Sequence, residues 1–259
     1  MELSKCPAGI VVTVTDPDAA MPAELRKHVP TDIRTERAAA WPPGEPVDRY
    51  WQDRGMGLNV LVGVPAHADL VVIGELLERA GAHQWIGPDP AEVRGAEYEM
   101  WGYSGLHAVR RLAVHLAADG RLPEPLDGSR RAADDPLLTE VYRSLPGDPP
   151  GPFDHLIHHS DCEGYYVPVD FARVVVDEKA PGGHLGSSVR LLAEVRRIAE
   201  ALGLPEDLDP DSEEVVDAAD DEDPAAEGWR RYGVESHDCL RLLEAAKLSV
   251  STGAAIAFT

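Results

Sequence analysis

Three stretches of the chain repeat apolar residues at the three- and four-residue spacing of an amphipathic helix. They span residues 104–119, 189–202 and 237–248, and a glycine follows two of them directly. A helix with one apolar face must bury that face against another layer, so these stretches require a shared core. The clearest stripe consists of Leu106, Val109, Leu112, Ala113 and Leu116.

Short runs rich in β-branched residues accompany these helices. Residues 57–64 and 254–258 are typical of strands, and residues 69–80 and 136–144 predict two further helices. Strands and helices do not alternate as they do in repeated βαβ units. We therefore predict an α+β fold, with mixed helices and a small sheet, in a single main domain over residues 56–259.

The first 55 residues have a different character. Residues 8–15 alternate and are β-branched, which predicts one strand, but residues 16–55 are rich in proline and charge. We predict that residues 1–55 form an N-terminal extension made of this strand and an irregular segment.

Acidic residues are concentrated in one part of the chain. The formal net charge is −22, and residues 205–227 hold twelve of the 46 acidic residues and no Lys or Arg. The remainder has 34 acidic residues against 24 basic ones, so it is only moderately acidic. With three prolines and few large apolar residues, residues 205–227 predict a solvated, mobile loop.

The charge and the apolar pattern also exclude some classes of ligand. The densest groups of basic residues are pairs, such as Arg110-Arg111 and Arg196-Arg197, and a net negative surface repels phosphates. We therefore expect neither nucleic acid nor an anionic membrane as a partner. No apolar run approaches the roughly 20 residues that span a bilayer, and the N-terminus lacks a signal-peptide pattern. This predicts a cytoplasmic protein.

Residues 153–171, FDHLIHHSDCEGYYVPVDF, hold the densest group of chemically active side chains. The simplest interpretation is a tight turn without a ligand. In that turn Asp161 bonds the backbone, Gly164 adopts a positive φ, and Tyr165 and Tyr166 enter a strand.

An alignment of residues 159–170 with a calcium-binding EF-hand loop gives a second interpretation, with Gly164 at the invariant glycine. The first ligand position is then His159, a poor ligand for a hard cation, so we expect weak affinity if the loop binds calcium. The predicted calcium ligands are Asp161, Glu163, the Tyr165 carbonyl and Asp170.

A transition metal such as zinc is a third interpretation. His155 and His158 lie three residues apart and share a face if this segment is helical, and Asp161 or Cys162 could add a ligand. Nucleophilic attack by Cys162 with a nearby histidine as base is a fourth. The signatures of nucleotide-binding and common hydrolase sites are absent from the sequence, so no cofactor-binding residue is predicted beyond these calcium or zinc ligands.

Three short motifs resemble those of uncharacterised families. Residues 56–59 (MGLN) are similar to the MGLD start of short bacterial and phage proteins, which also have an aromatic segment resembling residues 101–107 (WGYSGLH). Residues 159–164 (HSDCEG) resemble an H-S-D-C-[DE]-G motif in bacterial proteins of unknown role. These families have no known activity, so the resemblance implies only that the core begins near Met56.

Two functions follow as hypotheses. The first is a cytoplasmic acidic protein with a weak metal-binding loop at residues 159–170. It binds a basic protein partner, such as a toxin or a nucleic-acid-binding protein, because opposite fields speed and orient association. The alternative is a metal-assisted hydrolase that uses the His/Asp/Cys cluster at 155–163, with His107, His158 and Cys162 as catalytic candidates. The sequence leaves open whether the chain is an enzyme and what oligomer it forms.

Overall fold

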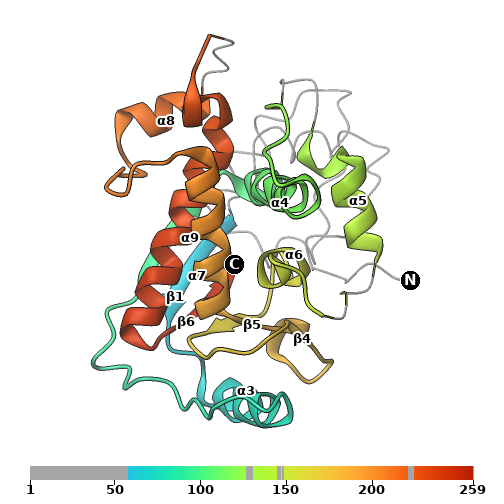
Figure 1. The fold of residues 1–259 in the computed structure, drawn as a ribbon. Coiled ribbons are helices and arrows are strands. Elements are labelled where there is room, and N and C mark those ends of the chain that lie inside the picture. Colours follow the sequence, from blue (N-terminus) through green and yellow to red (C-terminus); the bar gives the residue numbers. More distant parts are fainter. Residues whose placement is uncertain (1–57, 127–130, 145–146, 148, 221–224, 259) are drawn as a thin grey trace, which may run out of the picture. The chain divides into compact units, whose positions relative to one another are not determined.

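The computed structural model describes residues 58–126, 131–144, 147, 149–220 and 225–258, and the fold lies within the compact unit Gly57–Thr259 (Figure 1). The strand predicted at residues 8–15 lies outside the described residues. The described part contains seven α-helices and a six-stranded mixed sheet, which confirms the α+β prediction.

The sheet has the strand order β2-β1-β6-β3-β5-β4, and only the β3–β5 pair is parallel. Strand β6, close to the C-terminus, lies between β1 and β3, so Ala257 is opposite both Leu61 and Tyr165. The strand predicted at 254–258 is therefore central to the sheet. The strands are β1 (Leu58–Gly63), β2 (Ala96–Met100), β3 (Tyr165–Val167), β4 (Val175–Val176), β5 (His184–Ser187) and β6 (Ala255–Phe258).

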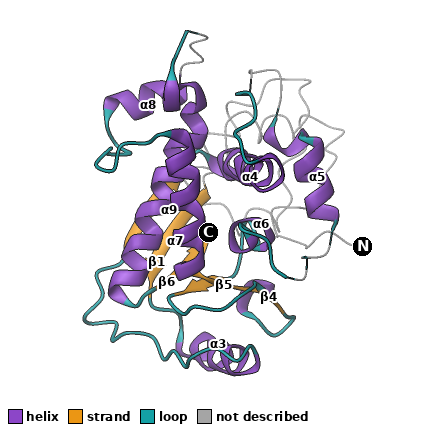
Figure 2. Cartoon of the chain, viewed as in Figure 1, coloured by secondary structure: helices purple, strands orange, loops and turns teal. Residues whose placement is uncertain are grey.

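Helices cover both faces of the sheet (Figure 2). On one face α4, α7 and α9 form the larger core with Leu58, Val60 and Val62 of β1. On the other, α3 packs Ile73 and Leu77 into a smaller core. The helices are α3 (His67–Arg79), α4 (Gly102–Asp119), α5 (Pro136–Arg143), α6 (Asp154–His158), α7 (Ser188–Leu202), α8 (Glu213–Asp220) and α9 (Gly233–Thr252).

The helix ends show where local signals were sufficient. Gly120 and Gly203 end α4 and α7 in the left-handed conformation, as their positions predict, and the Ser187 hydroxyl caps α7. In contrast, α4 begins at Gly102 before the expected cap Ser104, and α9 begins four residues before the predicted start. Tertiary contacts extend these helices beyond their apolar stripes.

The expectation of a mobile loop over residues 205–227 is wrong for residues 213–220, which form α8. Val215 is completely buried, and Leu208 packs partly buried against the same core. The few apolar residues of this acidic segment are sufficient because they are spaced to point inward, while the carboxylates point to solvent. Residues 208–220 are therefore part of the folded unit.

One glycine permits α8 to lie against α9. Gly233, the first residue of α9, is buried, and a Cβ atom there would overlap the carbonyl group of Ala218 in α8. We predict that Gly233→Ala lowers the free energy of unfolding by about 1–3 kcal/mol, because α8 must move away from α9. Urea unfolding measures this change.

The control is Gly74→Ala in α3, where the space around the new methyl group is open. Alanine favours a helix interior by about 1 kcal/mol over glycine, so this variant should be slightly more stable than the wild type. Equal stability of the Gly233→Ala variant and the wild type would contradict the close contact.

Candidate functional site

His155, a predicted zinc ligand, is fully engaged inside the fold. Its Nδ1 atom accepts a hydrogen bond from the Ser187 backbone N–H at 2.9 Å, and its Nε2 atom lies 3.0 Å from the Phe171 carbonyl oxygen, to which it donates. Burial lowers the pKa of His155 to about 4, so the ring is neutral. No nitrogen lone pair remains for a metal.

A buried glutamate side chain fixes the short helix that carries this histidine. Both Glu194 oxygens accept backbone N–H groups at the start of α6, from His155 at 3.1 Å and Leu156 at 2.7 Å. Burial raises the pKa of Glu194 to about 8, against the lowering effect of these two hydrogen bonds. Glu194 therefore joins α7 to α6.

The turn interpretation has the right geometry but a different residue bonds the backbone. The Ser160 hydroxyl accepts hydrogen bonds from the backbone N–H groups of Cys162 and Glu163, at 3.3 and 3.2 Å, in the role predicted for Asp161. Gly164 has a φ of 92°, and Tyr165 begins β3. Residues 160–164 are thus a tight turn into a strand.

Three of the four predicted calcium ligands have separate partners. Asp161 lies 3.6 Å from His107, the Tyr165 carbonyl lies 3.2 Å from His159 Nε2, and Asp170 pairs with Arg190 at 2.5 Å. Because residues 165–167 extend as β3, the segment does not curl around an ion as an EF-hand loop does.

The zinc expectation meets the same difficulty. Among the described residues, no group of three or more His, Cys, Asp or Glu side chains is placed to hold a metal ion. The expected calcium or zinc loop therefore has no support in this part of the chain.

The structure does bring His107 and Asp161 together, with a third group that sequence reasoning missed. His107 Nδ1 lies 2.8 Å from the Tyr142 hydroxyl, and His107 Nε2 faces Asp161. Burial and then Arg110 lower the pKa of His107 to about 4, while Asp161 raises it. The buried Arg110 donates to the Leu156 and His159 carbonyls. The cluster joins α4, α5 and the turn.

The other catalytic candidates lie near this junction. Cys162 contacts the Ser160 hydroxyl at 3.6 Å, and His158 is half-buried at the end of α6, where burial lowers its pKa. The roles predicted for His107, His158 and Cys162 in catalysis stay predictions.

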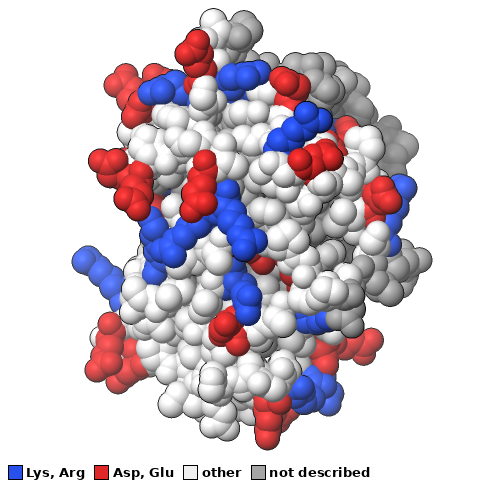
Figure 3. All heavy atoms as spheres, in the orientation of Figure 1, with Lys and Arg blue, Asp and Glu red and all other residues white. Residues whose placement is uncertain are grey.

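A second feature of the described surface is a set of carboxylates from the loop before α8 and from α8 itself. We call these eight exposed side chains the acidic surface. In Figure 3, Asp and Glu side chains gather at the upper left, where Figure 1 places α8 and this loop. The acidic surface consists of Glu206, Asp207, Asp209, Asp211, Glu213, Glu214, Asp217 and Asp220.

Few of these charges are neutralised by neighbours. Asp211 pairs with Arg241 of α9, and Glu214 pairs with Arg230, each at 2.5 Å. Within the described residues, the other six carboxylates of the acidic surface form no ion pair. They present their full charge to solvent and to any partner.

The backbone beneath the acidic surface is held in place. Pro210 and Val215 are buried, and Asp209 accepts a hydrogen bond from the Asp211 backbone N–H at 2.9 Å. Ser212 bonds the Asp209 carbonyl through its hydroxyl at 2.7 Å. Sequence composition revealed the charge of this segment but not its fixed shape, because that shape depends on packing against α9.

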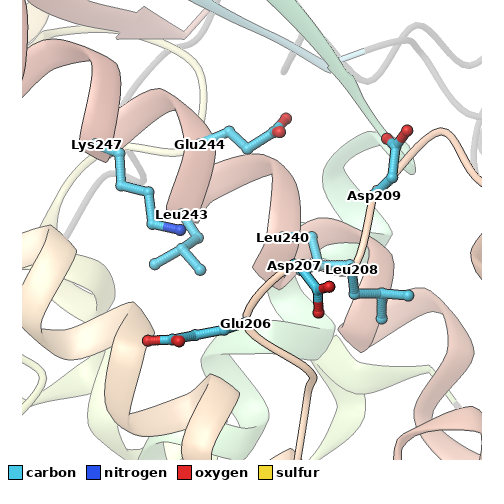
Figure 4. Close-up of a pocket in the computed structure, with 8 residues that line it drawn as sticks. All are labelled: Glu206, Asp207, Leu208, Asp209, Leu240, Leu243, Glu244 and Lys247. Carbon is cyan, nitrogen blue, oxygen red and sulfur yellow. The ribbon is translucent and has the colours of Figure 1, made fainter.

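A hollow of about 360 Å³ lies where the loop meets α9 (Figure 4). Burial raises the pKa of Glu244, Arg241 lowers it, and Asp211 and Asp209 raise it, so the negative potential of the acidic surface extends to α9. The hollow is lined by Glu206, Asp207, Leu208, Asp209, Leu240, Leu243, Glu244 and Lys247.

A comparison with protein families fits this geometry. The model of the family described as "Putative DNA-mimic protein" matches residues 56–258. The chain belongs to this family. No curated protein and no solved structure matches the chain. No helix in the described part of this DNA-mimic family member is long and apolar enough to cross a membrane.

Membership in the DNA-mimic family assigns the chain a binding role, that of an acidic interaction protein. It also corrects the expected partner. The exclusion of nucleic acid is what needs correction, because the family description makes DNA the molecule whose charge pattern matters, whereas a basic protein partner is consistent with it. A negative surface repels DNA itself, but the same charge can take the place of DNA on a basic surface.

The buried histidines predict how stability depends on pH. Burial lowers the pKa of His107 and His155 to about 4 and that of His159 to about 3. An unfolded chain binds these protons near pH 6.5, so each histidine stabilises the fold above that pH. As the pH falls from 6.5 towards the pKa in the folded state, each histidine lowers the free energy of unfolding by up to about 1.4 kcal/mol per pH unit. Urea unfolding at several pH values between 7 and 5 measures the slope.

A variant isolates one histidine from the opposing effect of Glu194, whose raised pKa favours stability at low pH. In His155→Gln the amide can donate to the Phe171 carbonyl and accept from the Ser187 N–H without taking up a proton. Its stability should fall less steeply with decreasing pH than that of the wild type. Parallel curves would contradict the burial of a neutral His155.

Proposed function

We propose that the protein occupies the DNA-binding surface of a DNA-binding protein, with the acidic surface in the place of phosphates. The observation that carries this proposal is a fixed array of carboxylates, six of them without an ion pair in the described structure, on a member of the DNA-mimic family. On this proposal the protein acts in the same compartment as its DNA-binding partner, and we propose that this compartment is the cytoplasm.

The spacing of the carboxylates along α8 supports the proposal. Glu213, Asp217 and Asp220 lie four and three residues apart on one side of the helix. The helix rise separates them by about 6 and 4.5 Å along its axis. One DNA strand carries a phosphate about every 3.4 Å of helix axis, so this row has a charge density of similar order.

The rigidity of the segment also supports the proposal. A binding surface that is already ordered loses less conformational entropy on association than a flexible acidic tail does. The buried Val215 and the contact of Gly233 with Ala218 hold α8 in place before a partner arrives. The groove of a DNA-binding protein fits a stiff duplex, and a fixed row of carboxylates resembles such a ligand more closely than a flexible acidic tail does.

The two paired carboxylates have a different use. Asp211 and Glu214 are held by Arg241 and Arg230, which offset the repulsion that eight neighbouring carboxylates create. The six others remain available to cationic groups of a partner. The six unpaired carboxylates thus provide charge for binding a partner, while the two ion pairs reduce the repulsion that opposes folding of the segment.

A triple amide variant, Glu213→Gln with Asp217→Asn and Asp220→Asn, tests the proposal. The full chain is immobilised and exposed to DNA-binding proteins of its source that were eluted from a DNA column with salt. We expect the wild type to retain a protein that duplex DNA displaces, and the variant to bind it at least about tenfold more weakly, since exposed ion pairs contribute up to about 1 kcal/mol each.

The matched control neutralises three exposed acids elsewhere, with Glu75→Gln, Glu78→Gln and Asp89→Asn. It has the same net charge as the triple amide variant but leaves the acidic surface unchanged. It should therefore bind the retained protein as the wild type does. If both variants weaken binding equally, binding depends on net charge alone and not on the acidic surface, which contradicts the proposal. A retained protein that binds DNA and this chain at the same time would contradict the proposed mimicry.

A further inference from the structure

Helix α7 presents a row of exposed residues that its packing leaves uncovered. Its opposite side supplies Leu191, Val195 and Ile198 to the core, so the exposed row lies along the outer side of the helix. In Figure 3, Lys and Arg side chains gather in the middle of the face in view, where Figure 1 shows α7. We call this row the α7 ridge, and it consists of Arg190, Ala193, Arg196, Arg197, Glu200 and Ala201.

The charges of the α7 ridge are ordered along the helix. Arg190 lies in the first turn, Arg196 and Arg197 follow near the middle, and Glu200 lies in the last turn. The exposed Glu206 and Asp207 come directly after the helix. The positive half of this row thus precedes its negative half.

A row of this kind is complementary to itself when two copies lie antiparallel. A two-fold axis beside residues 198 and 199 places Arg197 of each copy opposite Glu200 of the other. It also directs Arg190 toward the region of Asp207. Each ion pair then occurs twice, as in the isologous interface of a symmetric dimer. Ala193 and Ala201 place no bulky side chain between the helices.

We propose that the α7 ridge is a docking surface for a second copy of this chain, in a two-fold dimer with antiparallel α7 helices. The proposal is independent of the binding of a DNA-binding partner. Its support is the charge complementarity of the ridge with itself, together with the charges that remain unpaired. Within the described residues, Arg196 and Glu200 form no ion pair.

Contacts within the chain single out Arg197 and Glu200 as the central pair. Arg190 already pairs with Asp170 at 2.5 Å, so its contribution to a dimer is shared. Arg197 makes one long hydrogen bond, 3.4 Å, to the Pro152 carbonyl, and its charge lowers the pKa of the buried Glu194, but it forms no ion pair within the described residues. The Arg197–Glu200 pair therefore determines whether two copies associate.

The net charge of −22 gives this dimer an unusual salt dependence. At about 0.01 M salt, where the Debye length is about 30 Å, repulsion between two acidic copies opposes association. At about 1 M salt the ion pairs themselves are screened. Association should therefore be strongest near 0.1 M, where long-range repulsion is screened and close pairs persist.

Sedimentation equilibrium of the full chain at these three salt concentrations tests the proposal. We expect a reversible dimer that is most populated near 0.1 M salt. Arg197→Glu and Glu200→Arg should each raise the dimer dissociation constant by about tenfold or more, because like charges then face each other across the interface. An equimolar mixture of the two variants should associate again, since each opposed pair regains opposite charges.

Arg121→Glu is the matched control, because it reverses an exposed arginine outside α7 with the same change in net charge. It should dimerise more tightly than Arg197→Glu. A wild type that is monomeric at all three salt concentrations, or a mixture of the two α7 variants that stays monomeric, overturns the proposal. So does duplex DNA binding that Arg197→Glu abolishes while the chain stays monomeric, which would assign the α7 ridge to nucleic acid.

Discussion

The packing of α9 is the constraint on which the described structure depends. This helix contacts α4, α7, α8 and the strands β1 and β2, so it connects the sheet to the acidic surface. Asp238, completely buried in α9, accepts a hydrogen bond from the Trp101 backbone N–H at 2.8 Å and thereby fixes the start of α4. Gly105 is required opposite it, because a Cβ atom there would overlap the Asp238 carboxylate.

The same helix explains how a strongly charged segment can be rigid. Repulsion among neighbouring carboxylates favours an expanded chain, and only burial and a few ion pairs oppose it. Val215 supplies the burial, and Arg241 of α9 supplies one of the ion pairs. The acidic surface thus depends on the core, so the proposed binding through this surface and the stability of the fold are coupled through α9.

Much of the fold could be predicted from the sequence, because the signals were local. The apolar stripe of α4, its terminal Gly120 and the strand at 254–258 all follow from periodicity and backbone preference. Strand β2 and helix α8 were missed, because few of their residues point inward. Two of the five residues of β2 are Glu97 and Glu99, and six of the eight residues of α8 are acidic or alanine. Their structure comes from pairing with β1 and packing on α9.

The candidate site was harder to predict than the fold. The composition of residues 153–171 predicted a ligand site, but His155 and Glu194 satisfy backbone groups and hold α6. The composition of the acidic segment is typical of an unstructured loop, and only packing against α9 gives its carboxylates fixed positions. Composition identifies which side chains are present, whereas the site depends on which of them the core leaves free.

Hydrogen exchange over α8 is the most direct test of this account, because a fixed acidic surface requires an ordered helix in the free protein. Backbone amides of residues 216–220 should exchange at least about a hundredfold more slowly than in an unfolded chain, as expected for a helix docked on a core. Exchange at the unfolded rate would show that the acidic segment is not held by α9. The carboxylates would then form no fixed array.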